Sequence, residues 1–121
     1  MTKKTILIVE DDQEMHKLYK AQLESEYVLL TAQDTKQARI TLKMNKPDMI
    51  ILDIILPNEG GDTFLSFLKS KEQYKDIPVL GTTILNDIEQ ELHKLDPELI
   101  YLPKPFTKKA LLSSIKKALK E

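Results

Sequence analysis

The sequence predicts an α/β fold, a doubly wound sheet of five parallel strands with helices on both faces. Short apolar runs rich in β-branched residues recur along the chain, and a segment with helical spacing of apolar residues follows each one. The run at residues 49–52 carries no charge, as expected of a strand that is buried on both faces of a parallel sheet. Five such alternations favour a doubly wound parallel sheet.

The five predicted strands are apolar runs that end at polar or turn-forming residues. They cover residues 5–9, 27–32, 49–53, 77–83 and 99–102. Pro103 follows the last run, and proline is confined to sheet edges and strand ends because it cannot donate a hydrogen bond to a ladder. The fifth strand is therefore predicted to lie at an edge of the sheet.

The five predicted helices follow the strands, and each has one apolar face. They begin at or just after Gln13, Asp34, Gly61, Asp87 and Thr107. Asp34 and Asp87 each precede a glutamine by three residues, which is typical of a capping box, and Thr107 is a favourable N-cap. Apolar positions at helical spacing, including Leu18 in the first helix and Leu95 in the fourth, are expected to face the sheet.

The length of 121 residues predicts one domain, residues 1–121, large enough to bury a core without disulfides or structural metals. The chain has 18 basic and 19 acidic residues, so bulk charge does not favour direct binding of nucleic acid. Cysteine is absent, which favours an intracellular setting. No apolar run is long enough to span a bilayer, and no secretory signal is visible. These features predict a cytoplasmic protein that contacts neither membranes nor nucleic acid directly.

The segment from Pro57 to Gly61 is predicted to be a turn that follows the third strand. It contains two of the three glycines in the chain. Its backbone is therefore expected to need the conformational freedom that glycine provides.

Polar side chains with distinctive chemistry follow four of the predicted strands. They are Glu10, Asp11 and Asp12 after the first, Asp53 ending the third, Thr83 ending the fourth and Lys104 after the fifth. The carboxyl ends of parallel strands meet at one edge of the sheet, where such folds bind ligands. Clustered carboxylates repel one another, and Mg²⁺ relieves that repulsion by binding carboxylates, water and phosphate oxygens. With a lysine and a hydroxyl nearby, the set predicts transfer of a phosphoryl group to a carboxylate nucleophile.

This ordered set resembles the receiver domain of bacterial two-component response regulators, in particular the single-domain, chemotaxis-Y-like receivers. The motif comprises Glu10-Asp11, Asp53 followed by Pro57 and Gly61, then Thr83, and finally Lys104-Pro105-Phe106. The resemblance covers the chain essentially from end to end. It implies a flavodoxin-like (βα)5 fold with strand order 2-1-3-4-5, which agrees with an edge position for the fifth strand.

The resemblance also implies how the site would work. Asp53 would accept a phosphoryl group from a phosphohistidine on a sensor histidine kinase or phosphotransfer protein. Mg²⁺ would be held by Glu10, Asp11, Asp53 and the main-chain carbonyl of Ile55, with Asp11 as a direct ligand and Glu10 acting mainly through water. Such a domain is not a separate enzyme, but it promotes its own phosphorylation and dephosphorylation.

Three further residues have implied roles in switching. Lys104 would pair with the phosphoryl oxygens, Thr83 would move to hydrogen-bond them, and Tyr101 would rotate inward in response. A cis peptide bond before Pro105 is also implied. The face built by the fourth helix, fifth strand and fifth helix, around Tyr101, is the expected contact for a downstream effector protein, because no output segment is visible in the sequence.

The sequence departs from the family pattern near the switch threonine. Ile84 and Leu85 follow Thr83, where small residues are common. Gly81 and Thr82 stand where the fourth strand is usually apolar, and Pro103 precedes the lysine. Like Leu85, Ile55 has an aliphatic side chain that offers no group to orient a hydrolytic water. Slow loss of the phosphoryl group is therefore expected.

Three alternatives account for parts of this pattern. A phosphatase with an aspartate nucleophile would carry a second aspartate two residues further on, where this chain has Ile55. A degenerate receiver would act as a binding module, although such a domain is expected to lack Asp53 or Lys104. The chain is also consistent with a receiver fragment of a longer regulator. Taken singly, the acids after the first strand are typical of a solvated loop, and His16 and His93 are typical of the surface.

Overall fold

The computed structural model describes residues 2–121 and confirms the predicted alternation of strands and helices. The strands are Thr5–Val9 (β1), Val28–Ala32 (β2), Met49–Asp53 (β3), Val79–Thr83 (β4) and Ile100–Pro103 (β5). The helices are Gln13–Leu23 (α1), Thr35–Met44 (α2), Gly61–Ser70 (α3), Glu89–Leu95 (α4) and Lys108–Leu119 (α5). None of the helices in residues 2–121 is long and apolar enough to cross a membrane.

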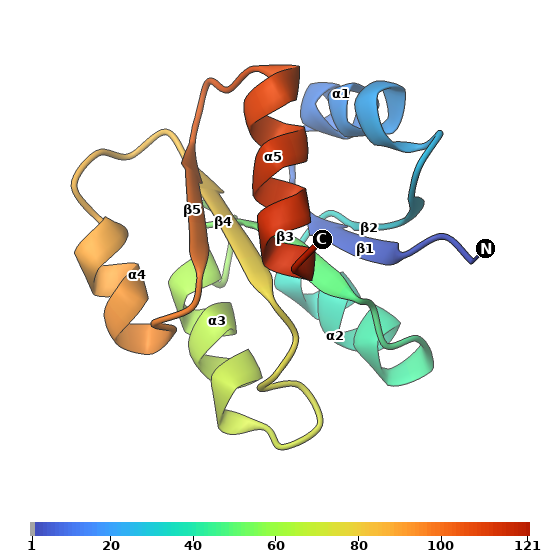
Figure 1. The fold of residues 1–121 in the computed structure, drawn as a ribbon. Helices are drawn as coiled ribbons and strands as arrows, with labels where there is room; N and C mark the ends of the chain where they lie inside the picture. Colours follow the sequence, from blue (N-terminus) through green and yellow to red (C-terminus); the bar gives the residue numbers. More distant parts are fainter. Residues whose placement is uncertain (1) are drawn as a thin grey trace.

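The five strands form one parallel sheet in the order β2-β1-β3-β4-β5 (Figure 1). The fifth strand lies at an edge, as Pro103 predicts. The register pairs Asp53 with Thr82 and Thr83 with Pro103. The strand ends that carry the predicted polar residues therefore meet at the same edge of the sheet.

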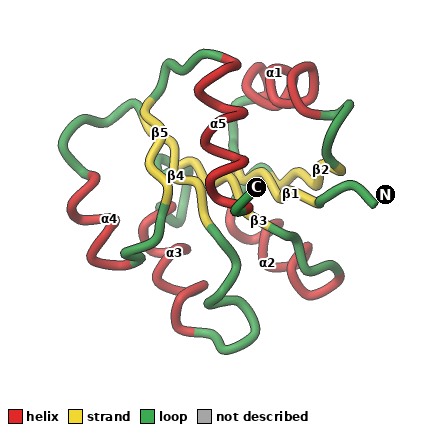
Figure 2. The backbone as a smooth tube through the Cα atoms, in the orientation of Figure 1, coloured by secondary structure: helices red, strands yellow, loops and turns green. Residues whose placement is uncertain are grey.

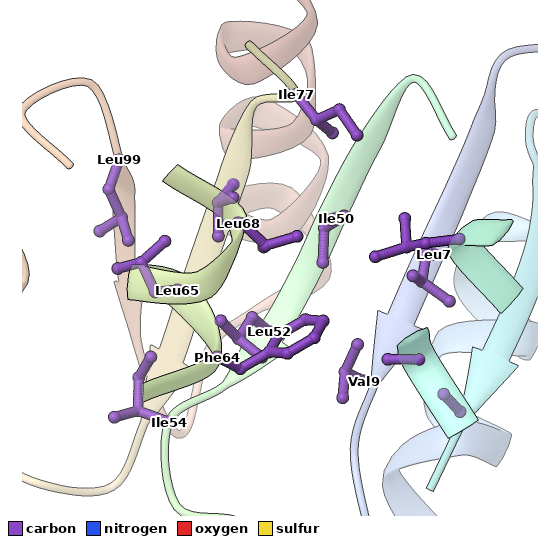
Figure 3. Close-up of a cluster of buried hydrophobic side chains, with 14 of the residues drawn as sticks. Leu7, Val9, Ile50, Leu52, Ile54, Phe64, Leu65, Leu68, Ile77 and Leu99 are labelled. Carbon is purple, nitrogen blue, oxygen red and sulfur yellow. The ribbon is translucent and has the colours of Figure 1, made fainter. Parts of the chain in front are cut away.

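Helices cover both faces of the sheet, as a doubly wound fold requires (Figure 2). Side chains of β1 and β3 alternate between the two faces because successive residues of a strand point in opposite directions. Leu7 and Ile50 pack with α2, α3 and α4, and Phe64 of α3 lies in the same cluster (Figure 3). Ile8 and Ile51 pack with α1 and α5 on the other face. Both faces of the central strands are thus buried, which explains why their sequences are apolar without a break.

Two of the three predicted N-caps are confirmed. The Asp34 carboxylate accepts a hydrogen bond from the Gln37 amide at 2.8 Å, and the Thr107 hydroxyl accepts one from Ala110 at 3.0 Å. The capping prediction for Asp87 is wrong. Asp87 has a left-handed φ of 61°, and α4 begins later, with Ile88 at its N-cap position. The chain therefore turns once more before the helix starts.

Three details of the predicted packing differ from the structure. Leu18 and Leu95 are 36% and 37% exposed, because α1 and α4 bury narrower faces centred on Tyr19 and Leu92. The fourth strand begins at Val79 rather than at residue 77, since the preceding proline cannot donate to the ladder. None of these differences moves the residues at the carboxyl edge.

The turn after β3 uses glycine for a reason other than the predicted one. Gly60 has an ordinary φ of −66°, and the left-handed residue is Asn58, with a φ of 69°. Gly61 is needed because α3 starts directly against the end of β3. A Cβ atom there would lie 2.5 Å from the Asp53 carbonyl oxygen and 2.6 Å from the Ile54 Cα atom. Close approach of the backbone, rather than backbone freedom, is the constraint.

We predict that Gly61→Ala lowers the free energy of unfolding by about 1–3 kcal/mol, because both clashing atoms belong to the backbone and cannot rotate away. Gly60→Ala is the matched control, since the added Cβ would meet the Asp62 carboxylate, which is the end of a flexible side chain. Urea unfolding of the two variants measures the difference. Equal stabilities for Gly61→Ala and Gly60→Ala would contradict the prediction.

Candidate functional site

Three carboxylates meet at the carboxyl edge of the sheet. Glu10 directly follows β1, Asp11 comes next, and Asp53 is the last residue of β3. Each offers one oxygen atom to a group in which these atoms lie within 4.8 Å of one another. Glu10 and Asp53 are 1% and 6% exposed, whereas Asp11 is exposed. Two of the three carboxylates are therefore buried and the third faces solvent. Their hard oxygen donors fit Mg²⁺.

Lys104 connects two of these acids. Its Nζ atom donates to Glu10 Oε1 at 2.8 Å and to Asp53 Oδ2 at 3.2 Å. The side chain arrives there because the Lys104 amide donates to the carbonyl of Thr83 at 2.9 Å, which fixes the chain just beyond β5. The peptide bond from Lys104 to Pro105 is cis, as the family resemblance implies. The single ammonium group thus lies between the two buried carboxylates.

Backbone contacts fix the position of Glu10. Its amide donates to the carbonyl of Ala32 at 3.0 Å, which extends the pairing between β1 and β2 by one residue. Glu10 Oε2 accepts a hydrogen bond from the Asp12 amide at 3.1 Å. The Asp12 carboxylate instead accepts from the Glu14 amide at 2.9 Å and caps α1. Asp12 is therefore a capping residue and does not belong to the cluster.

The charges in the cluster are not balanced by Lys104 alone. Burial raises the pKa of Glu10 above its usual value, and the charge of Asp53 adds to this, while the hydrogen bond from Lys104 acts against it. Burial alone would lower the pKa of Lys104, but the hydrogen bond to Glu10 and the charges of both acids raise it overall. The site therefore has excess negative charge that a divalent cation would neutralise.

Thr83 and Tyr101, the two predicted switch residues, are linked by hydrogen bonds through the backbone of Leu85. Thr83 is fully buried, and its Oγ1 atom accepts a hydrogen bond from the Leu85 amide at 3.0 Å. The hydroxyl of Tyr101 donates to the Leu85 carbonyl at 3.1 Å. Leu85 thus connects the end of β4 with the side chain of a half-buried tyrosine on β5.

Three exposed aliphatic residues lie in the loops that follow β3 and β4. Ile55 is 43% exposed, Leu85 44% and Ile84 70%. Ile55 follows Asp53 by two residues, and its amide donates to Asp53 Oδ1 at 3.1 Å. That apolar side chains flank the Asp53 carboxylate stays a prediction, and the three side chains are accessible in the loops that follow β3 and β4.

The histidines are placed differently from the prediction that both lie on the surface. His16 is half-buried, and its Nε2 atom forms a hydrogen bond with the Glu10 carbonyl at 2.5 Å. His93 is also half-buried and contacts the Leu99 carbonyl in the same way at 3.0 Å. His16 lies three residues before Tyr19, a spacing that places it beside the buried face of α1. That spacing could have indicated its supporting contact with Glu10.

Two buried hydroxyl groups lie next to the site and were not predicted. Thr82 and Tyr19 are 0% and 1% exposed. Neither hydroxyl has a hydrogen-bond partner within residues 2–121. Burial raises the pKa of the Tyr19 phenol, the nearby Thr82 hydroxyl acts against this, and the charges of Glu10 and Asp53 raise it further. The hydroxyl of Thr82, at a position where an apolar residue is expected, thus lies near a second buried hydroxyl, that of Tyr19 on α1.

Fold and site together define an α/β domain with an acidic, lysine-bridged pocket at the carboxyl edge of its sheet. The chain matches the sequence model of the family described as "Response regulator receiver domain" over residues 6–116. It belongs to this family, which comprises the phosphoacceptor signalling domains of two-component systems. Receiver domains generally bind Mg²⁺ in an acidic pocket, and the carboxylate cluster is such a pocket.

Known proteins and structures are similar along the whole chain. The phosphate regulon transcriptional regulatory protein PhoB of Pseudomonas aeruginosa is 33% identical over 122 residues, which is 99% of this chain and 53% of that protein. The chain thus spans about half the length of this relative. A putative response regulator from Chloroflexus aurantiacus is 27% identical with a TM-score of 0.88, covering 99% of this chain and 100% of that one. The chemotaxis protein CheY4 of Vibrio cholerae is 25% identical with a TM-score of 0.88, and the match covers 97% of this chain and 99% of that one.

Proposed function

We propose that residues 1–121 form a phosphorylation-activated switch in which Asp53 accepts a phosphoryl group. The donor is a phosphohistidine on a sensor histidine kinase or phosphotransfer protein, and the output is contact with a downstream effector protein. The observation that carries the proposal is the placement of Lys104 Nζ between Glu10 and Asp53, 2.8 and 3.2 Å from their oxygens. A cytoplasmic location and no direct contact with nucleic acid or membrane belong to the same proposal.

The acidic residues supply the metal site in this proposal. Asp11 and Asp53 would hold Mg²⁺, Glu10 would act mainly through water, and the Ile55 carbonyl would be the main-chain ligand. An ion bound there would supply positive charge for the phosphoryl oxygens. The exposure of Asp11 leaves the metal accessible from solvent, while the burial of the other two carboxylates keeps them close together.

The transfer step forms one bond and breaks another. An oxygen of the Asp53 carboxylate bonds to phosphorus as the phosphorus–nitrogen bond of the phosphohistidine breaks, and the electron pair of that bond returns to the imidazole. Lys104 keeps its charge and pairs with the phosphoryl oxygens. The Thr83 hydroxyl accepts from the Leu85 amide, so its own proton is free to be donated to a phosphoryl oxygen. In this way the domain promotes its own phosphorylation and dephosphorylation.

We predict that Asp53→Asn prevents phosphorylation and leaves the fold intact. Removal of one charge from the acidic cluster is expected to preserve or raise the thermal midpoint of the metal-free protein. Intact-mass measurement after incubation with Mg²⁺ and acetyl phosphate checks this. Asp12→Asn is the matched control, because asparagine also caps helices well, and it should still gain one phosphoryl group.

The same assay distinguishes the alternative functions. One stable added phosphoryl group indicates a receiver, continuous release of phosphate indicates a phosphatase, and no change indicates a binding module. A phosphoryl group found on Asp53→Asn under conditions that modify the parent would show that another residue is the acceptor.

We also propose that the output surface is built by α4, β5 and α5 around Tyr101. The hydrogen bonds from Leu85 to Thr83 and from Tyr101 to Leu85 support this, because a movement of Thr83 would disturb the contact that holds the tyrosine.

Backbone amide shifts on phosphorylation should therefore extend to Tyr101 and its neighbours on β5. In Tyr101→Phe, which lacks the hydroxyl, the shifts on β5 should shrink. Changes restricted to the loop after Asp53 would exclude this surface.

The last prediction of this section is slow dephosphorylation. Hydrolysis needs a water in line with phosphorus, and the exposed Ile55 and Leu85 side chains, which flank the predicted approach, cannot orient one. Ile55→Asn combined with Leu85→Glu should shorten the phosphate lifetime by about tenfold, which is about 1.4 kcal/mol of barrier. The measurement is loss of phosphate over time in Mg²⁺. Ile40→Asn, a change at a 53% exposed isoleucine on α2, is the control. A parent that loses phosphate within seconds would contradict the prediction.

A further inference from the structure

The loop between β3 and α3 is tied to a helix on the same face of the sheet by an ion pair. Arg39 of α2 donates from Nη2 to Glu59 Oε2 at 2.9 Å, across 20 residues of sequence. The two side chains are 36% and 24% exposed, so water only partly screens the pair. Among residues 2–121, Arg39 is the only basic side chain that pairs with Glu59.

Aromatic contacts hold the guanidinium of Arg39 in place. Its Cζ atom lies 4.3 Å from the ring centroid of Phe67 and 5.6 Å from that of Phe64, both on α3. The two rings stack with their centroids 5.7 Å apart. Because a planar guanidinium stacked on an aromatic face loses little further freedom on pairing, Arg39 is well prepared to fix Glu59.

The segment that Glu59 anchors is short and closed. The Gly61 amide donates to the Ile54 carbonyl at 2.8 Å, so the six residues 55–60 form a loop whose ends meet. Within it, the Glu59 amide donates to the Pro57 carbonyl at 2.8 Å, and Asn58 has a left-handed φ of 69°. A loop of this size with fixed ends moves little when one of its residues is tethered. The position of Glu59 therefore influences the orientation of the Ile55 peptide at the other end.

We propose that Arg39 is a positioning residue for the acceptor site, holding the loop of residues 55–60 so that the Ile55 carbonyl is oriented for a divalent cation. This rests on the proposed function, in which that carbonyl is a Mg²⁺ ligand. Mg²⁺ tolerates little departure from octahedral geometry, so a loosely held carbonyl lowers affinity. Groups that orient metal ligands from outside the ligand set commonly affect affinity by an order of magnitude.

The test compares variants that remove the ion pair without removing packing. Arg39→Met keeps an unbranched stem over Phe67, and Glu59→Gln keeps the shape of the side chain. Lys75→Met is the matched control, because it breaks the 3.3 Å ion pair with Glu72, whose side chain is 88% exposed. Arg39→Lys tests rescue, since it restores the charge without the planar fork.

Two readouts are needed besides the thermal midpoint. Amide shifts of the unphosphorylated protein during titration with Mg²⁺ give its dissociation constant. Hydrogen exchange of the Gly61 amide in EDTA reports the closure of the loop without metal. We expect Arg39→Met and Glu59→Gln to weaken Mg²⁺ binding by at least about threefold, to speed Gly61 exchange by a similar factor, and to shift the thermal midpoint no more than the control does. Arg39→Lys should fall between the parent and Arg39→Met.

The outcomes separate this proposal from the proposed function. A parent that binds no Mg²⁺ would overturn the metal-dependent function, and the Gly61 exchange rates would still test the tether. A parent that binds Mg²⁺ while Arg39→Met and Glu59→Gln match Lys75→Met in both readouts would overturn the positioning role alone. A fall in affinity that the control matches would likewise overturn the positioning role, because removing the positive charge of Lys75 cannot by itself weaken binding of a cation.

Discussion

Charge balance among Glu10, Asp53 and Lys104 is the constraint on which the rest of the site depends. Two carboxylates that are almost fully buried face one ammonium group, with Asp11 as a further negative charge at the surface. Removing charges from water is costly unless they are paired, and a single lysine leaves an excess of negative charge. The arrangement is therefore incomplete by itself and is suited to a divalent cation.

The parallel sheet makes this arrangement possible. Glu10 and Asp11 follow β1, Asp53 ends β3 and Lys104 follows β5, and pairing of β1, β3, β4 and β5 brings these strand ends together. The apolar bodies of the strands are buried between two helix layers, which fixes the register because a slip of one residue would turn core side chains outward. The core thus specifies where the polar residues at the strand ends lie.

The site is connected to the surface by its loops rather than by the sheet. After β4, the backbone of Leu85 joins Thr83 to the tyrosine at position 101. After β3, the close packing of Gly61 and the pair between Arg39 and Glu59 hold the loop that follows Asp53. The loop after β4 is thus linked to β5, and the loop after β3 is linked to α2.

The sequence by itself determined the alternation of strands and helices, the edge position of β5 and the set of polar strand ends, because apolar periodicity and proline chemistry are local properties. It also determined the N-caps at Asp34 and Thr107, which depend on residues three positions apart. Only the tertiary structure decided that Asp12 caps α1, that His16 supports Glu10, that Gly61 is needed for close approach and that Arg39 reaches Glu59. These contacts join segments whose distance in space depends on how helices pack on the sheet, or they select one of two local roles that a side chain could play. Local pattern cannot make that selection, because the competing partners lie elsewhere in the chain.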